Sequence, residues 1–192
     1  MARFTRAELE SFRDAEVPDL LPGPDDPELR LLFVGINPGL WTAATQTHFA
    51  HPGNRFYPAL LLAGIVTEPI SPSDGMTDAD RDRLRARGIG ITNIVRRATA
   101  RAAELSDAEL RSGGLQLVET VRRASPRVVA IAGVTAYRVA FGQRRAALGR
   151  QSEPLEGAEV WVVPNPSGLN AHETVASLAV AYAEAARAAG VV

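Results

Sequence analysis

Four short segments of the chain are almost continuously apolar, at residues 30–36, 89–95, 127–132 and 159–163. Apolar runs of this length, without polar alternation, are typical of strands buried on both faces of a sheet. Segments with helical periodicity lie between them. Buried strands that alternate with helices predict an α/β domain with a mostly parallel central sheet.

Two capping boxes mark the starts of predicted helices. Thr5 with Glu8 predicts a helix that runs to about residue 15, and Ser106 with Glu109 predicts a second one. The second helix would bury one face, formed by Leu110, Gly114, Leu117 and Val121.

Weaker signals predict the remaining helices. Asn54 is a candidate cap for a helix through residue 63, with Gly64 as its end. Residues 134–141 form a short helical pattern, and residues 81–87 resemble a solvated helix face. The last helix has an apolar seam made by Val175, Leu178, Ala179 and Tyr182.

The length of 192 residues and a hydrophobic content of 46% are sufficient for one domain with a sizeable core. We expect residues 1–192 to form this single domain, with residues 1–29 as an N-terminal helix and proline-rich lead-in. The first residues lack the apolar core of a signal peptide, and no stretch approaches the roughly 20 apolar residues of a membrane span. We therefore expect a protein of the bacterial cytosol without a membrane partner.

Cysteine and lysine are both absent, and all 21 basic residues are arginine. The lack of cysteine excludes disulfides, thiolate zinc sites and cysteine-bound iron–sulfur clusters. The lack of lysine leaves no side-chain amine for a Schiff base. Because the net charge is −1, nucleic-acid binding would require a local basic patch.

Two of the predicted strands end in asparagine-proline, at Asn37-Pro38 and Asn165-Pro166. Open α/β sheets bind ligands at the carboxyl ends of their strands, so we expect the chemistry there. An isolated Asn-Pro-Gly would be explained equally by an Asx-type turn that ends a strand.

The segments GINPGL and HFAHPGNRFY, within residues 35–57, and NPSGL, within residues 163–169, carry a family resemblance. They resemble the two signature motifs of the mismatch-specific uracil/thymine DNA glycosylases, a branch of the uracil-DNA glycosylase superfamily. GITNIVRRAT, the SDAEL helix and AIAGVTAY continue the likeness, which spans residues 31–186.

The resemblance implies a doubly wound three-layer α/β/α sandwich. It implies excision of uracil, with thymine as a second candidate base, from G:U and G:T mismatches in double-stranded DNA during base excision repair. It also implies that no metal or organic cofactor is needed, and we expect a monomer.

Cleavage of an N-glycosidic bond requires a flipped base, a stabilised leaving group and a positioned water. The resemblance assigns Asn37 to catalysis, where its amide can orient water but cannot take its proton. It assigns Phe49 to stacking on the base, although core packing is the alternative for this residue. Backbone N–H groups near Ile36 and Phe49 are candidates for binding base carbonyls and the leaving anion.

Three further residues are candidates for contacts to the base. Asn93 could read the N3–H and O2 edge of a pyrimidine, or could be an ordinary cap. The bulk of Thr42 disfavours the methyl group of thymine, whereas His48 resembles the thymine-processing members. Thr42 and His48 therefore give opposite indications about whether thymine is accepted. His51 is expected only to close the turn before Pro52.

The second motif is expected to meet the DNA duplex. The resemblance makes Leu169 the wedge that fills the hole left by the flipped nucleotide, and Gly168 a backbone contact to the unpaired guanine. Asn165 and Ser167 belong to the same predicted DNA-binding turn. Asn170 and Glu173 suggest that a helix starts directly after this turn, although a plain strand-to-helix turn is the alternative.

Arginines after the second strand are candidates for contacts to phosphate, namely Arg96, Arg97 and Arg101. Some relatives carry an arginine shortly after the wedge leucine, and this chain does not. With no lysine available, we expect a monofunctional enzyme that leaves an abasic site. Three histidines and no cysteine make a metal site improbable.

Two alternatives stay open from the sequence. The first is a superfamily member that prefers single-stranded uracil or deaminated purines. The second is a non-catalytic α/β module that binds nucleotides or DNA damage.

Overall fold

The computed structural model describes residues 4–192, in which five strands form one sheet in the order β2-β1-β3-β5-β4. The four predicted strands are confirmed and run parallel, as β1 (Leu31–Gly35), β2 (Ile89–Asn93), β3 (Val128–Ala132) and β5 (Glu159–Val163). The edge strand β4 (Gly149–Arg150) is antiparallel to β5. It was not predicted, because two residues carry no recognisable pattern.

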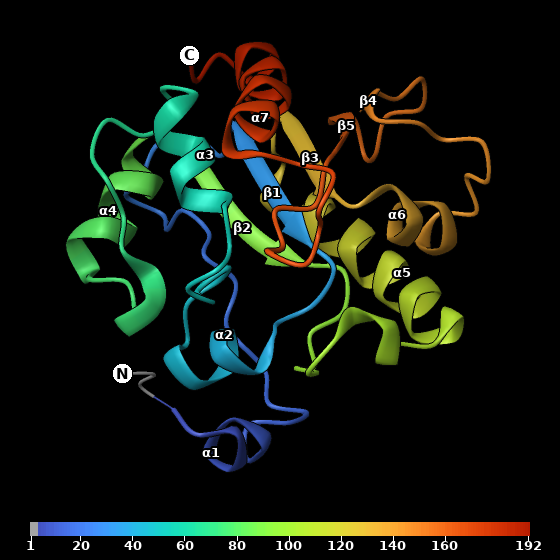
Figure 1. Cartoon of the computed structure of the whole chain (residues 1–192). Coiled ribbons are helices and arrows are strands. Elements are labelled where there is room, and N and C mark those ends of the chain that lie inside the picture. The colour runs from blue at the N-terminus through green and yellow to red at the C-terminus, as the bar shows by residue number, and fades with distance from the viewer. Residues whose placement is uncertain (1–3) are drawn as a thin grey trace.

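Helices cover both faces of the sheet (Figure 1). One layer is formed by α3 (Phe56–Leu62), α4 (Asp78–Ala86) and α7 (Val175–Ala189). The other is formed by α5 (Asp107–Ala124) and α6 (Val134–Ala140). The predicted three-layer α/β/α architecture is confirmed.

The side chains of β1 alternate between the two layers. Leu31 and Phe33 belong to the core beneath α3 and α7, whereas Leu32 and Val34 belong to the core beneath α5 and α6. All four side chains are fully buried. Because both faces of this strand exclude water, its sequence is continuously apolar rather than alternating.

The N-terminal helix α1 (Arg6–Glu10) begins at the predicted capping box but ends earlier than the prediction of residue 15. Turns follow it, and Asp14 has the left-handed φ of 64°, which cannot continue a helix. The lead-in then pairs with the outer edge of β2, where Leu20 and Ile91 exchange hydrogen bonds of 2.9 and 2.8 Å. The lead-in thus covers a strand edge that would otherwise be open.

A short helix, α2 (Leu40–Thr45), follows the Asn-Pro-Gly turn and was not predicted. It packs on α1 at the carboxyl end of the sheet (Figure 1). Single 3₁₀ turns occupy Pro72–Asp74 and Ala102–Glu104. No helix within residues 4–192 is long and apolar enough to cross a bilayer.

One predicted helix cap is confirmed and one is displaced by a residue. The N-cap of α3 is Arg55, which makes no side-chain cap bond, and the predicted cap Asn54 lies just before it. Asn54 accepts a hydrogen bond of 2.9 Å from the backbone N–H of Phe56, the first residue of α3. Ser106 and Glu109 form a complete capping box at the start of α5. The charged face of α4 is solvated as expected, with arginine–aspartate pairs along it.

Candidate active site

A cavity of about 1080 Å³ opens at the carboxyl ends of the four parallel strands. Both sequence motifs contribute to it, and so do α1 and residues 99–104. Most of the predicted site residues line it, namely Ile36, Asn37, Thr42, Phe49, Asn93, Asn165, Ser167, Gly168 and Leu169. The strand ends therefore bring together residues that are up to 133 positions apart, since 169 − 36 = 133.

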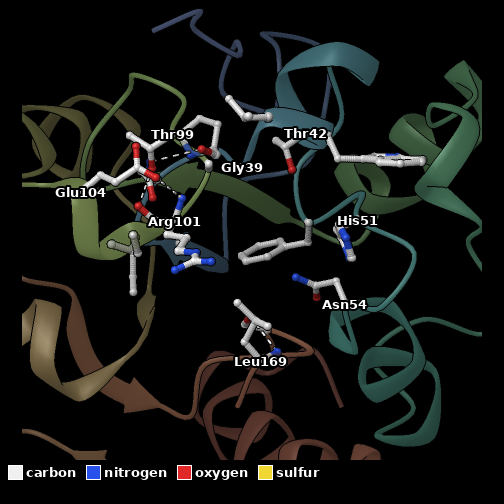
Figure 2. Close-up of a pocket in the computed structure, with 18 of the residues that line it drawn as sticks. Gly39, Thr42, His51, Asn54, Thr99, Arg101, Glu104 and Leu169 are labelled. Atoms are coloured by element: carbon white, nitrogen blue, oxygen red, sulfur yellow. Dashed lines mark hydrogen bonds between the residues drawn. The ribbon is translucent and has the colours of Figure 1, made fainter. Parts of the chain in front are cut away.

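The two sides of this cavity come from different parts of the chain (Figure 2). Thr99 and Arg101 lie on one side, Thr42 and Asn54 on the other, and Leu169 approaches from the C-terminal loop. The cavity is therefore bounded by the first motif, by the segment after β2 and by the second motif.

The orientation of the Asn37 amide is fixed by the hydrogen bonds that its nitrogen, Nδ2, makes to the protein. Nδ2 lies 2.8 Å from the hydroxyl of Thr99 and 3.1 Å from the carbonyl oxygens of Pro38 and Arg97. The Thr99 hydroxyl donates its own proton to the carbonyl of Arg101 at 2.9 Å, so it can only accept from Asn37. These contacts assign the NH₂ group to the protein and leave Oδ1 as the acceptor for a ligand or water.

Two carboxylates, Glu10 and Glu104, line the same cavity, and both bind Arg13. The hydrogen bond from Arg13 holds the pKa of Glu104 below its usual value. Glu104 also accepts from the backbone N–H of Arg101 at 2.9 Å. Because ion pairing weakens a carboxylate as a base, Glu104 is not well suited to deprotonate a water beside Asn37.

The ring of Phe49 has two roles in the structure. One face stacks on Phe56, with ring centroids 4.1 Å apart and an angle of 26° between the planes. The residue also lines the cavity, and its backbone N–H donates to no other group within residues 4–192. Core packing and exposure to a ligand are thus both present, rather than alternatives.

Phe49 adopts a left-handed backbone conformation, with φ of 56°. A non-glycine residue in this region is uncommon and is concentrated at functional sites. The Gly35 backbone lies directly beneath, since a Cβ at this position would be 2.4 Å from Asn93 Oδ1 and 3.2 Å from the Phe49 ring. Glycine is therefore required at the end of β1 to let both side chains close the floor of the cavity.

Asn93 is bound from behind by His48. The imidazole Nε2 of His48 lies 3.0 Å from the carbonyl oxygen of Pro18, which can only accept, so Nε2 carries the proton. Nδ1 then accepts from Asn93 Nδ2 at 3.1 Å. Asn93 is left with Oδ1 and one N–H for a ligand, and it caps no helix.

The prediction that His48 contacts the base is wrong, because the side chain lies outside the cavity. His48 is buried and does not line the cavity, because its ring packs between the lead-in and Asn93. Burial lowers the pKa of His48 below 6.5, which favours the neutral tautomer described above. His48 therefore orients a candidate base-binding residue instead of contacting the base.

Thr42 and Ile36 lie where the sequence placed them. Figure 2 shows the Thr42 side chain directed into the cavity, on α2. Ile36 lines the wall, and its carbonyl accepts from the Val95 N–H at 2.9 Å. His51 closes its turn as expected, since its Nδ1 accepts from the Gly53 N–H at 3.0 Å, and it also borders the cavity.

The second motif forms a loop, residues 164–174, whose tip is Leu169. The Leu169 side chain is 85% exposed, which is unusual for a large apolar residue. The predicted helix start at Asn170 is wrong, because α7 begins at Val175, where Thr174 makes the capping box. The turn that follows β5 is closed by Asn165, whose Oδ1 accepts a hydrogen bond from the Ser167 N–H at 3.1 Å.

Arg96 and Arg97 do not line the cavity, which contradicts their predicted place at its edge. Arg96 pairs with Asp19 at 3.0 Å. Arg97 pairs with Glu109 at 2.5 Å and Asp14 at 2.9 Å, and it holds the pKa of Glu109 at about 2. Both guanidinium groups join the lead-in to the body of the domain, a role that spacing alone does not reveal.

Arg101 lines the cavity as expected, and the structure adds Arg6 from α1. Neither guanidinium has a carboxylate partner within residues 4–192. Sequence reasoning missed Arg6, Thr99 and Asn54 as cavity residues. Asn54 could have been found from its place in the first motif, whereas Arg6 and Thr99 carry no such signal. Within residues 4–192, no group of three or more acidic or histidine side chains could hold a metal ion.

Comparisons with known proteins agree with this geometry. Residues 22–186 match the family model of the uracil DNA glycosylase superfamily. The solution structure of a candidate uracil DNA glycosylase from Methanosarcina acetivorans superimposes with a TM-score of 0.55 at 18% sequence identity. The match covers 87% of this chain and 97% of that one, and it shows a shared fold. Since the family model covers most of the sequence, this chain belongs to the uracil-DNA glycosylase superfamily.

Proposed function

We propose that this protein excises uracil from mismatches with guanine in double-stranded DNA and leaves an abasic site for base excision repair. The observation that carries the proposal is the fixed amide of Asn37. Its NH₂ group is held by protein acceptors, and its Oδ1 is free beside a cavity that also holds Phe49 and Asn93.

Asn37 positions the water for the chemical step. Oδ1 accepts a hydrogen bond from water, whose oxygen bonds to C1′ as the bond between C1′ and N1 of uracil breaks. The bonding electron pair leaves with the base as an anion, and the water proton passes to solvent. The Phe49 N–H is free to donate to this anion. Without a general base, the enzyme lacks a factor of roughly 10²–10⁴ in rate.

Asn93 distinguishes uracil from cytosine. Its Oδ1 accepts from the N3–H of uracil, while its second N–H donates to a neighbouring carbonyl of the base. Cytosine has no N3–H, and its N3 is itself an acceptor, so the contact to Oδ1 would be lost and two acceptors would face each other. His48 prevents the amide from rotating to suit cytosine, because its Nδ1 needs a donor.

Thr42 makes uracil the preferred base over thymine. Its side chain is buried in the wall of the cavity, where an additional methyl group on the base must find room. A single methyl group gives only about 1–3 kcal/mol of discrimination. We therefore propose that thymine opposite guanine is a poor substrate rather than an excluded one.

The DNA duplex meets the rim of the cavity. Leu169 enters the base stack and takes the place of the flipped nucleotide. Arg6 and Arg101 bind phosphates, because they are the cavity arginines without carboxylate partners in the described chain. The enzyme is monofunctional, since the sequence contains no lysine to form a Schiff base with the abasic sugar.

The proposal is tested with matched duplexes that differ only in the target base pair. Uracil opposite guanine should be excised fastest, then uracil opposite adenine, and thymine opposite guanine slowest. The product should be an intact strand with an abasic site. Faster excision of hypoxanthine, or of uracil in single strands, would instead support the other branches of the superfamily.

Asn37→Ala is the decisive variant. Excision should fall by at least about 100-fold, while the dissociation constant for the mismatched duplex stays within a few-fold of the unsubstituted value. Gln143→Ala, at an exposed amide outside the cavity, is the matched control and should leave both unchanged. A protein that binds damaged DNA but never excises a base would overturn the proposal.

A further inference from the structure

The wedge loop, residues 164–174, lacks helix and strand structure. Its internal hydrogen bonds are all short-range and join residues two to five positions apart. Asn170 Nδ2 donates to the Asn165 carbonyl at 3.0 Å, and the Asn170 N–H donates to the Ser167 carbonyl at 2.9 Å. These bonds close the turn around Leu169 but do not attach it to the rest of the domain.

Arg55, at the start of α3 in the first motif, attaches this turn to the domain. The first residue of the loop, Pro164, is held separately, since the Tyr182 hydroxyl donates to its carbonyl at 3.1 Å. Arg55 Nη2 donates to the carbonyl oxygens of Ser167 at 2.5 Å and Asn170 at 2.7 Å, and its Nη1 donates to that of Glu173. The Arg55 backbone N–H also donates to the Pro166 carbonyl at 3.0 Å. One residue therefore binds the loop on both sides of Leu169.

The acceptors of Arg55 are backbone carbonyls, and no carboxylate pairs with it within residues 4–192. The guanidinium is planar and presents its donors in a fixed fork. Carbonyls bound to this fork must converge on one plane, so the fork sets the curvature of the loop. An ammonium group on a flexible stem would not impose the same shape.

The first motif also supports the loop through close backbone contact. A Cβ on Gly168 would lie 2.5 Å from the carbonyl oxygen of Gly53. The loop therefore rests directly on the segment that precedes Arg55. Leu169, the next residue, has no such support and is exposed.

From these contacts we infer that Arg55 is a positioning residue for the wedge. It holds the loop in its curved form before DNA arrives, so that Leu169 enters the base stack without a prior ordering step. This inference rests on the proposed function. A preorganised loop loses less conformational entropy on binding than a flexible one, which favours insertion.

The test is a double-mutant cycle with Arg55→Gln and Leu169→Ala, measured as kcat/KM on a duplex with uracil opposite guanine. Each single variant should lose on the order of tenfold to 100-fold. The loss of kcat/KM in the double variant should be no greater than the loss in the less active single variant. A misplaced leucine and a missing leucine both leave the base stack unfilled, so the two losses should not multiply. Effects that multiply, or an Arg55→Gln variant as active as the unsubstituted enzyme, would overturn the inference.

A second readout separates positioning from damage to the catalytic cavity. Uracil in an unpaired bubble needs no wedge, so Arg55→Gln should excise it within a few-fold of the unsubstituted rate. Equal losses on duplex and bubble would contradict the inference. If Arg55→Gln unfolds, Arg55→Lys is carried through the same cycle, where the loss of the fork should still couple to Leu169. Arg138→Gln is the matched control, since Arg138 also donates to a backbone carbonyl but lies on α6, away from the loop.

Failure of the proposed function would look different. In that case the unsubstituted protein would excise no base from any duplex. The fluorescence of 2-aminopurine beside the mismatch would then report insertion directly. A rise on binding that disappears in Arg55→Gln and in Leu169→Ala would support the inference without catalysis, and a rise that persists in Arg55→Gln would refute it.

Discussion

The amide nitrogen of Asn37 lies 2.8 Å from the hydroxyl oxygen of Thr99, which is 62 residues further along the chain. This contact, together with two backbone carbonyls, determines which end of the Asn37 amide is presented to the cavity. When the NH₂ group faces the protein, the amide oxygen faces the cavity and can accept a hydrogen bond from water. In the opposite orientation the amide could only donate to the cavity. The catalytic role that we propose for Asn37 therefore depends on a residue outside both motifs.

Replacement of Thr99 by valine should impair the chemical step. Valine has the shape of threonine but cannot accept from Asn37, so the amide is held less firmly. We expect kcat for uracil excision to fall about tenfold, with KM within twofold, because one of several contacts to Asn37 is lost. Thr99→Ser restores the hydroxyl and should regain most of the rate. Single-turnover kinetics on the U:G duplex would measure this, and an equal loss in both variants would contradict the role of the hydroxyl.

His48 should make stability depend on pH in the weakly acidic range. Its pKa is lower in the folded protein than its ordinary value of 6.5, mainly because of burial. The unfolded chain therefore takes up the proton first, and the free energy of unfolding should fall as pH drops below 6.5. The slope from this one group cannot exceed about 1.4 kcal/mol per pH unit.

Urea denaturation between about pH 7 and pH 5 would measure the slope, and NMR titration of the imidazole would give the pKa directly. His48→Asn should flatten the profile over this range. Glu109 acts in a separate range, since its pKa of about 2 affects stability only below its ordinary value of 4.5. An unchanged slope in His48→Asn would show that another group is responsible.

Thr42→Ala should widen the range of accepted bases. Removal of the hydroxyl and methyl groups from the cavity wall gives room for the methyl group of thymine. We expect the ratio of thymine to uracil excision, both opposite guanine, to rise by roughly tenfold or more. Paired excision assays on the two duplexes would measure the ratio. If the ratio stays constant, Thr42 does not contact the 5-position of the base.

Arg6→Gln and Arg101→Gln should each weaken DNA binding in a salt-dependent manner. Loss of one phosphate contact lowers the slope of log Kd against log salt by about one. The losses should be similar for matched and mismatched duplexes, because phosphate contacts carry no sequence information. Arg144→Gln, at an exposed arginine that does not line the cavity, is the control. A slope that is unchanged in Arg6→Gln would remove α1 from the DNA interface.

The main features of the fold could be predicted because they depend on local patterns. A strand buried on both faces must be apolar throughout, and Ser106 and Glu109 mark a helix start regardless of what packs around it. The elements that were missed are short. The two residues of β4 and the six of α2 are stabilised by tertiary contacts rather than by their own sequence.

The candidate site was predicted in part. Asn37 follows β1 and Asn93 ends β2, and the carboxyl ends of these parallel strands meet, so their proximity could be expected. Phe49 lies beyond α2, and only the family resemblance indicated its place. The positions of the His48 and Arg97 side chains could not be predicted, because a residue close to the site in sequence can direct its side chain away from the cavity. His48 turns to the carbonyl of Pro18, and Arg97 turns to Glu109 and Asp14.

By itself, the sequence determined the class of fold, the edge of the sheet at which the cavity forms and the chemistry that its side chains can perform. These follow from hydrophobic periodicity and from the functional groups of asparagine, phenylalanine and arginine. Only the tertiary structure decided which end of the Asn37 amide faces the cavity, which arginines are free for phosphate and which one supports Leu169. Each of these depends on hydrogen-bond partners that are distant in the chain, and no local pattern encodes them.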